Sequence, residues 1–248
     1  MVKLEDALGN LGRGDEMGER VTLTASDGFR LGAYRSNPEG APKGVVVVIQ
    51  EIFGVNHHIR AVCDRLSGQG FIALAPAIFD RKVRDFESGY SDAERARALA
   101  FLSDFDWSAA LRDIEPAVLE LRATGAPAVI GFCLGGSLAF LAATRLDGLA
   151  ASICFYGGQI ARFADEKPRC PTQMHFGDHD QSIPLSDIQK IKAKRPDCDI
   201  HIYHAGHGFN CDERASYEPE SAALAWRRSS EWLEAAFSGQ APAPRNLD

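Results

Sequence analysis

A glycine-rich turn joins a predicted strand to a predicted helix at Val129-Ile130-Gly131-Phe132-Cys133-Leu134-Gly135-Gly136-Ser137. Cys133 stands at the turn, with Gly131 two residues before it and Gly135 two residues after it. Glycines at these places let the backbone reverse sharply without a steric clash. The helix start also favours a thiolate, because its unpaired N–H groups and dipole stabilise negative charge. Cys133 is therefore a candidate nucleophile, although a cysteine between apolar residues is equally typical of core packing.

The composition suits a protein with a sizeable apolar core. The chain has 248 residues, of which 45% are hydrophobic, and a formal net charge of −7. Acidic and basic residues are interspersed, which argues against a nucleic-acid partner and against a polybasic membrane-binding patch. The first residues contain no apolar segment of signal-peptide length, and no run of about 18 apolar residues occurs. We therefore expect a cytoplasmic protein that binds neither nucleic acid nor a membrane.

Six cysteines are spread along the chain without a C-x-x-C pair. Several lie in apolar runs, which indicates reduced thiols rather than a disulfide framework or a zinc site. The spacing His201-x-x-His204-x-x-His207 is a weak metal motif, because a period of three fits neither face of a strand. We therefore expect no metal and no organic cofactor.

Short apolar segments alternate with amphipathic segments along most of the sequence. A hairpin is predicted first, with strands at residues 20–25 and 29–34 around the turn Ser26-Asp27-Gly28. The β-branched run of residues 45–49 is typical of a strand buried on both faces of a parallel sheet. Further strands are predicted at residues 71–75, 127–132, 150–155, 172–176 and 199–203. Helices are predicted at residues 57–68, 91–102, 106–124, after Cys133, 185–194 and 217–237.

This order predicts an α/β fold, with one doubly wound and mostly parallel sheet of about eight strands and helices on both faces. We expect a single domain over residues 20–237. The polar segment of residues 1–19 is expected to form an N-terminal arm, and residues 238–248 a flexible tail. Ser91 and Asp106 are predicted to cap the N-termini of two helices.

Ligands bind outside the carboxyl ends of the strands in open α/β sheets, so the loops after the strands are candidates for a site. Cys133 follows one predicted strand, Asp178 and Asp180 follow another, and His207 follows the last. This chain order of nucleophile, acid and histidine is that of the α/β-hydrolase fold. The chemistry needs all three, because an imidazole must take the thiol proton and a carboxylate must fix the tautomer of that imidazole.

Asp180 is favoured over Asp178 as the carboxylate, because it lies farther into its loop, four residues before Pro184. His207 is favoured as the base, because glycines on both sides let the backbone present its ring. The remaining histidines are poorer candidates, since they fall within predicted strands or at the start of a helix.

Two backbone N–H groups are expected to stabilise a developing oxyanion. One belongs to Leu134, directly after the candidate nucleophile, and the other to Ile52, in the loop after residues 45–49. Phe53 in the same loop is a candidate substrate-binding residue.

Four motifs together resemble the dienelactone hydrolase (carboxymethylenebutenolidase) family of the α/β-hydrolase superfamily. The resemblance covers about residues 20–237 and rests on Gln50-Glu51-Ile52-Phe53-Gly54, Gly131-Phe132-Cys133-Leu134-Gly135-Gly136, Gly177 to Pro184, and Ala205-Gly206-His207-Gly208-Phe209. It implies a hydrolase that opens a small lactone or ester with a triad of Cys133, Asp180 and His207. It also implies that Glu51 contacts the resting thiol until the substrate displaces it, so that the thiolate forms only when ligand is bound.

The resemblance further implies that Arg81 binds a substrate carboxylate. A second family arginine, four residues beyond the triad histidine, is replaced here by Cys211. Two guanidinium groups hold a carboxylate more strongly than one, so dienelactone is a poorer substrate unless Arg214 compensates. A broad carboxylesterase or thioesterase is therefore one alternative, and a non-catalytic thiol-bearing binding protein is another. We expect a small-molecule lactone or ester as the partner, and a monomer or small homo-oligomer.

Overall fold

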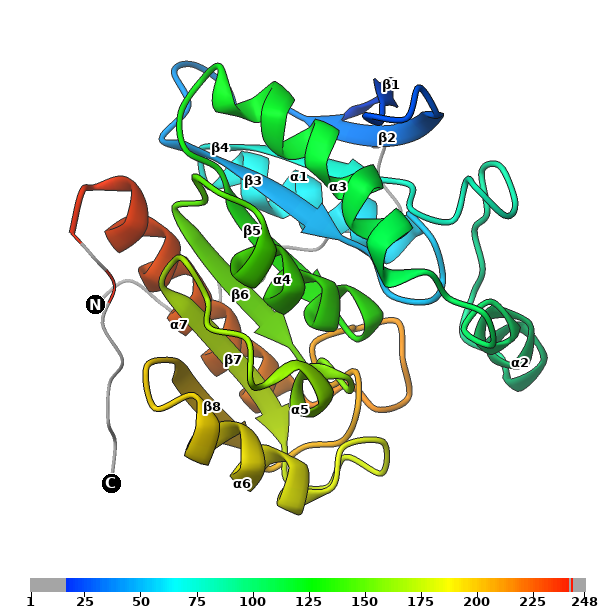
Figure 1. The fold of residues 1–248 in the computed structure, drawn as a ribbon, viewed down its shortest axis with the longest axis vertical. Coiled ribbons are helices and arrows are strands. Elements are labelled where there is room, and N and C mark those ends of the chain that lie inside the picture. The colour runs from blue at the N-terminus through cyan, green and yellow to red at the C-terminus, as the bar shows by residue number, and fades with distance from the viewer. Residues whose placement is uncertain (1–16, 241, 243–248) are drawn as a thin grey trace.

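The computed structural model describes residues 17–240 and 242. In this part of the chain, eight strands form one sheet in the order β1-β2-β4-β3-β5-β6-β7-β8 (Figure 1). β1 pairs antiparallel with β2, and β2 pairs antiparallel with β4, whereas the other neighbouring strands are parallel. The prediction of a mostly parallel, doubly wound sheet of about eight strands is confirmed.

The strands lie close to the positions expected from the sequence. All residues from Val45 to Ile49 are buried, as expected for a β-branched strand covered on both faces. The same holds for every residue of β4 and β5, which flank this strand, and of β6, which pairs with β5. The bounds are β1 Glu19–Thr24, β2 Arg30–Ser36, β3 Gly44–Ile49, β4 Phe71–Pro76, β5 Ala128–Phe132, β6 Ala151–Phe155, β7 Thr172–Gly177 and β8 Asp199–Tyr203.

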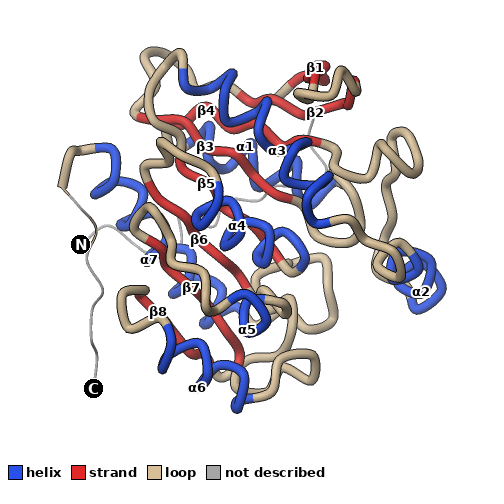
Figure 2. Tube along the Cα trace, viewed as in Figure 1, coloured by secondary structure: helices blue, strands red, loops and turns tan. Residues whose placement is uncertain are grey.

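Helices cover both faces of the sheet. Figures 1 and 2 show α1 and α7 on one face, and α3, α4, α5 and α6 on the other. The short helix α5 is not expected from the sequence, because four residues are too few to show a periodic pattern. The bounds are α1 His57–Gly68, α2 Asp92–Ala100, α3 Trp107–Arg122, α4 Leu134–Arg145, α5 Ile160–Phe163, α6 Leu185–Lys194 and α7 Pro219–Phe237.

The predicted N-caps of α2 and α3 are present. Ser91 forms a capping box with Glu94 at the start of α2, and the Asp106 carboxylate accepts hydrogen bonds from backbone N–H groups of α3. The last helix starts at Pro219 rather than at residue 217. The Glu218 carboxylate caps it, and proline at the first helical position has no N–H to satisfy.

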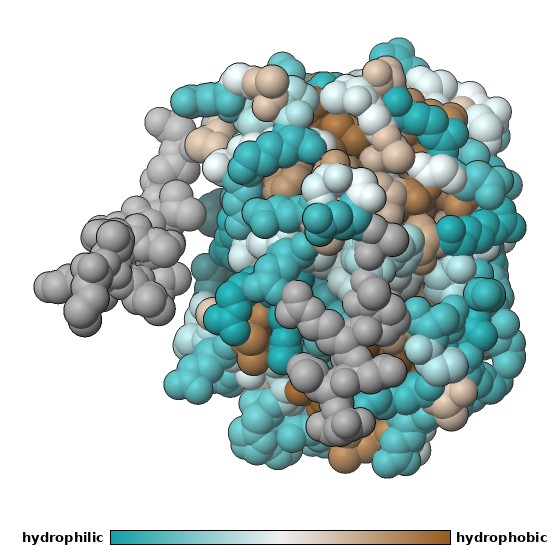
Figure 3. Space-filling model, turned by 90° about the vertical axis from the view of Figure 1, so that its left-hand side faces the viewer, coloured by the Kyte–Doolittle hydropathy of each residue, from teal (hydrophilic) through white to brown (hydrophobic). Residues whose placement is uncertain are grey.

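The helix α2 stands apart from the sheet, beyond the carboxyl ends of the central strands (Figure 1). Within the described ranges, no helix combines the length and apolar character needed to cross a membrane. The face in Figure 3 is mostly hydrophilic, with apolar side chains visible in separate patches. Residues 1–16 of the expected arm, and residues 241 and 243–248 of the expected tail, lie outside the described residues.

Candidate active site

Cys133 lies at the turn between β5 and α4 in a strained backbone conformation. Its φ is 54°, in the left-handed region that residues other than glycine rarely adopt. A Cβ on Gly131 would lie 1.9 Å from the carbonyl oxygen of Gly135, and a Cβ on Gly135 would lie 2.2 Å from that of Ile49. Neither position can accept a side chain, so the predicted sharp turn with its two glycines is confirmed.

The structure brings His207 and Asp180 to Cys133 from two other loops. His207 Nε2 lies 3.0 Å from Cys133 Sγ, and His207 Nδ1 lies 2.7 Å from Asp180 Oδ2. The other Asp180 oxygen accepts a hydrogen bond of 2.7 Å from the Ser182 N–H. The Ser216 hydroxyl donates to the His207 carbonyl oxygen at 2.7 Å. The three expected residues therefore form one chain of contacts. The bond from Ser182 fixes the Asp180 side chain, and the bond from Ser216 fixes the backbone of His207.

The pKa of His207 is raised to about 10. Burial of the ring opposes this rise, because it disfavours the charged imidazolium, but the Cys133 thiolate and the Asp180 carboxylate more than offset it. The arrangement therefore favours the protonated imidazolium form of His207 beside Cys133 Sγ and Asp180.

The raised pKa predicts that His207 contributes to stability in a pH-dependent way. The contribution is full below the ordinary pKa of 6.5 and is lost as pH rises through about 10, because the folded state holds the proton more tightly. The difference in free energy of unfolding between the unchanged protein and His207→Gln should therefore shrink over this range, as measured by urea unfolding. His204→Gln, in the same loop with a side chain 82% exposed, is the control. A constant difference would contradict this interpretation.

The two aspartates after β7 face different partners. Asp180 contacts His207, whereas Asp178 Oδ2 lies 3.3 Å from His204 Nδ1. His175 is buried in the sheet, with Nδ1 2.7 Å from the Tyr203 hydroxyl. The placement of Asp180 next to His207 agrees with the preference for this aspartate. The placement of His175 agrees with its interpretation as a structural residue.

A pocket of about 330 Å³ lies beside Cys133 and His207. Ile52 and Leu134, the expected oxyanion-hole residues, both line it. The lining also includes the apolar residues Phe53, Leu99, Leu102, Phe105 and Trp107 and the arginines Arg95, Arg162 and Arg214. The pocket therefore combines a thiol, apolar surface and positive charge.

Arg81 is not among the residues that line this pocket. Its guanidinium binds the buried Asp113 carboxylate, with Nη2 2.7 Å from Oδ1, and also binds Asp27, with Nη1 2.9 Å from Oδ2. It also stacks over the Phe29 ring at 4.4 Å. Its placement differs from the expectation of a substrate carboxylate partner, because acidic residues of this chain already occupy its donors.

Glu51 and Arg214 form a buried ion pair beside the pocket. Arg214 Nη1 lies 3.0 Å from Glu51 Oε1, and the two side chains are 15% and 1% exposed. The Cys133 thiol contacts His207 in this structure, while the Glu51 carboxylate contacts Arg214. Arg214, three residues after Cys211 in the sequence, therefore supplies a guanidinium on the pocket lining.

Sequence reasoning misses Tyr156, which directly follows β6. It is fully buried, its φ is 37°, and its ring centroid lies 5.2 Å from that of His207. Its position after the carboxyl end of a strand is the same signal that identifies the loop residues above. By contrast, Arg95 on α2 and Arg162 on α5 carry no such signal, because only the packing of those helices brings them to the pocket.

Comparisons with known proteins agree with this arrangement. A model of the "Dienelactone hydrolase family" matches residues 31–237. The chain is 35% identical over 225 residues to a "Putative carboxymethylenebutenolidase" of Synechocystis, which covers 81% of this chain and 89% of that protein. It is 31% identical over 228 residues to carboxymethylenebutenolidase 1 of Cupriavidus pinatubonensis, which covers 88% and 97%.

A solved structure from Klebsiella pneumoniae, described as a "Putative Dienelactone Hydrolase", superimposes with a TM-score of 0.75 at 27% identity. The match covers 87% of this chain and 98% of that one. Because the family model spans most of the sequence, and relatives above 30% identity span most of both chains, the chain belongs to the dienelactone hydrolase family and is an ester or lactone hydrolase.

Proposed function

We propose that this enzyme hydrolyses a small lactone or ester with Cys133 as the nucleophile, His207 as the general acid and base, and Asp180 as the group that orients the imidazole. The proposal rests on the chain of contacts from Asp180 through His207 to Cys133 Sγ at the pocket, with distances of 2.7 Å and 3.0 Å. Nucleophile, base and orienting carboxylate within hydrogen-bonding distance are the signature of covalent catalysis.

The proposed reaction has two steps. The Cys133 thiolate attacks the carbonyl carbon, the C–O bond of the lactone or ester breaks, and the leaving oxygen takes the proton from His207 Nε2. Water then attacks the resulting thioester while His207 accepts a proton from it, and the thiolate leaves with its electron pair. Asp180 stabilises the imidazolium that is present before the first step and re-forms in the second, and it keeps the Nδ1 proton in place throughout.

Two backbone N–H groups are proposed to hold the oxyanion in both steps. Leu134 is the first residue of α4, so its N–H has no acceptor within the helix, and Ile52 lies on the pocket lining. A donor aimed at the developing charge contributes about 3 kcal/mol to lowering the barrier.

Glu51 is proposed to position Arg214. The family resemblance implies a contact between this glutamate and the resting thiol. In this structure the thiol contacts His207 and Glu51 contacts Arg214, which is the arrangement that the resemblance implies once Glu51 has left the thiol. Because the pair is buried, removing either side chain would leave the other charge unpaired in the interior, which is costly in free energy.

The substrate is proposed to carry a negative group at one end and an apolar body. Arg95 and Arg162 are exposed on the pocket lining, whereas Arg214 is engaged by Glu51. A carboxylate at the pocket mouth would meet the first two arginines, while Phe53 and the neighbouring apolar residues would pack against the carbon skeleton.

This proposal predicts selectivity for a charged lactone. The unchanged enzyme should hydrolyse cis-dienelactone with a higher kcat/KM than its neutral methyl ester. The double variant Arg95→Gln/Arg162→Gln should lose about tenfold in kcat/KM on the carboxylate form and much less on the methyl ester, because exposed charge-assisted contacts are of modest strength. Steady-state kinetics on both substrates measure this.

Arg112→Gln removes an arginine that is 46% exposed and paired with Asp27 outside the pocket, and serves as the matched control. An equal loss on both substrates would contradict a carboxylate-binding role for the two arginines. If a p-nitrophenyl ester is hydrolysed and neither lactone is, the broad carboxylesterase alternative is correct instead.

We also propose that the enzyme works in a reducing compartment such as the cytoplasm. All six cysteines are free, and the proposed nucleophile is itself a thiol that oxidants would inactivate.

A further inference from the structure

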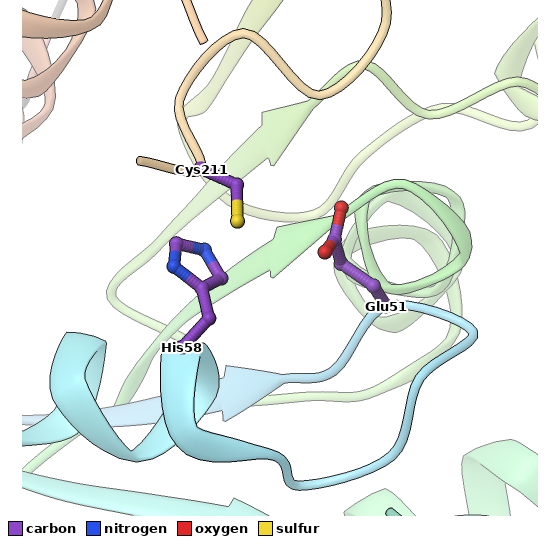
Figure 4. A group of neighbouring side chains, drawn as sticks. All are labelled: Glu51, His58 and Cys211. Atoms are coloured by element: carbon purple, nitrogen blue, oxygen red, sulfur yellow. The ribbon is translucent and has the colours of Figure 1, made fainter. Parts of the chain in front are cut away.

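A second group of chemically reactive side chains lies beside the ion pair of Glu51. Glu51 comes from the loop after β3, His58 from the first turn of α1, and Cys211 from the loop that follows His207 (Figure 4). One ligand atom from each of these residues lies within 4.8 Å of the other two. Figure 4 shows the thiol between the imidazole and the carboxylate.

These three side chains are buried, and two of them have unsatisfied polar atoms. Glu51 is 1% exposed, His58 2% and Cys211 0%. Among the described residues, neither Glu51 Oε2 nor His58 Nε2 has a hydrogen-bond partner. Buried polar atoms are almost always satisfied, so two such atoms in one cluster indicate a ligand that both of them would bind.

The donor set matches one class of ligand. Thiolate, imidazole and carboxylate together are the ligands that Zn²⁺ takes in proteins, whereas Ca²⁺ and Mg²⁺ require oxygen ligands. The negative charges of a Cys211 thiolate and the Glu51 carboxylate would balance a divalent cation. With three protein ligands, a fourth position stays open for water.

The surroundings orient each ligand. Asp212 Oδ1 lies 3.8 Å from His58 Nδ1, so a carboxylate faces the ring nitrogen opposite to the cluster. Carboxylates in this position orient the histidine ligands of metal sites, and here the Asp212 carboxylate lies on the Nδ1 side of the ring. Arg214 binds only the Oε1 atom of Glu51, so Oε2 is not used by this ion pair. The Cys211 S–H donates to the Tyr90 hydroxyl oxygen at 3.3 Å.

We propose that Glu51, His58 and Cys211 form a binding site for Zn²⁺, separate from the Cys133–His207 pair. Coordination forms a Zn–S bond to the Cys211 thiolate and a Zn–N bond to the neutral His58 ring, and the protons that these groups carry are released to solvent, with no change in oxidation state. The metal would hold Glu51 and thereby tie the loop after β3 to α1 and to the loop of residues 207–217. This proposal concerns metal binding and does not depend on whether Cys133 hydrolyses esters.

The test uses Co²⁺ as a coloured substitute for Zn²⁺, in full-length protein carrying Cys133→Ser. That background removes the other cysteine–histidine pair as a metal site. We expect one Co²⁺ per chain, an intense thiolate-to-cobalt absorption band, displacement by Zn²⁺, and a rise in Tm on adding Zn²⁺. The exposed group of Asp178, His179 and His204 has no thiol, so it cannot produce this band.

Variants in the same Cys133→Ser background show which side chains give rise to the thiolate-to-cobalt band. Cys211→Ser should abolish it, and Asp212→Asn should weaken metal binding about 10- to 100-fold, as expected for a partner of a metal-bound histidine. Cys170→Ser, a partly buried thiol outside the cluster, should leave the band unchanged. Circular dichroism shows whether each variant is folded.

Two outcomes would overturn the proposal. The band could be absent from the Cys133→Ser protein, which would place the metal at the nucleophile if the unchanged protein shows the band, or it could persist in folded Cys211→Ser. Because the first outcome needs no change in the cluster itself, the proposal stays falsifiable even if Cys211→Ser fails to fold. In that case His58→Gln, which keeps the thiol, should weaken Co²⁺ binding at least 10-fold, and unchanged affinity would also overturn it.

Discussion

Replacing Cys133 with alanine is expected to lower kcat for lactone or ester hydrolysis by about a millionfold, as removal of the nucleophile does in an enzyme whose triad acts as a unit. The oxyanion donors and the pocket would remain, but no atom at the turn could form the acyl-enzyme. The change is conservative for the fold, because alanine keeps the Cβ that the positive φ of 54° already accommodates. Loss of activity would therefore report chemistry rather than unfolding.

Steady-state hydrolysis of a lactone and a p-nitrophenyl ester measures this effect, with Cys170→Ala as the matched control. The control thiol is partly buried and lies outside the pocket lining, so its removal should leave kcat nearly unchanged. Mass spectrometry of the unchanged enzyme mixed with a slow ester should find the acyl group on the peptide that contains Cys133. Substantial turnover by Cys133→Ala would mean that another group attacks the carbonyl.

The parts of the fold that follow local rules can be predicted from the sequence. The β-branched run of residues 45–49 is buried as expected, because no other environment favours such a continuous apolar strand. The turn at Cys133 is only partly local, since a side chain at Gly131 would clash with Gly135 four residues later, whereas one at Gly135 would clash with Ile49 of the strand β3. Where steric clashes of the backbone determine the local conformation, the residue type alone is enough to predict it.

The placement of long side chains cannot be predicted in this way. Arg81 was expected at a substrate carboxylate, but Asp113, 32 residues away, takes its guanidinium, and a sequence does not show which distant carboxylate is nearer. Arg214 reaches Glu51 across 163 residues in the same manner. The cluster of Glu51, His58 and Cys211 joins three segments with no common spacing, so metal motifs based on short spacing do not detect it.

Replacing Asp180 with asparagine is expected to lower kcat by about 10³- to 10⁴-fold while the structure of the site is kept. The side chain is fully buried, with Oδ2 2.7 Å from His207 Nδ1 and Oδ1 held by the Ser182 N–H. In asparagine, the oxygen would keep the bond from Ser182 and the NH₂ group would face Nδ1. That arrangement stabilises the tautomer with its proton on Nε2, which cannot accept a proton from the thiol.

Asp178→Asn is the matched control, because the same chemical change is made two residues earlier on a carboxylate that faces His204 instead. Its kcat should stay close to that of the unchanged enzyme. The two variants together distinguish two causes. Loss of the orienting carboxylate lowers kcat only in Asp180→Asn, whereas a general loss of negative charge near His207 would lower kcat in both variants. If Asp178→Asn is the inactive variant and Asp180→Asn is active, the acid of the triad has been assigned to the wrong residue, and the contact seen at 2.7 Å is structural rather than catalytic.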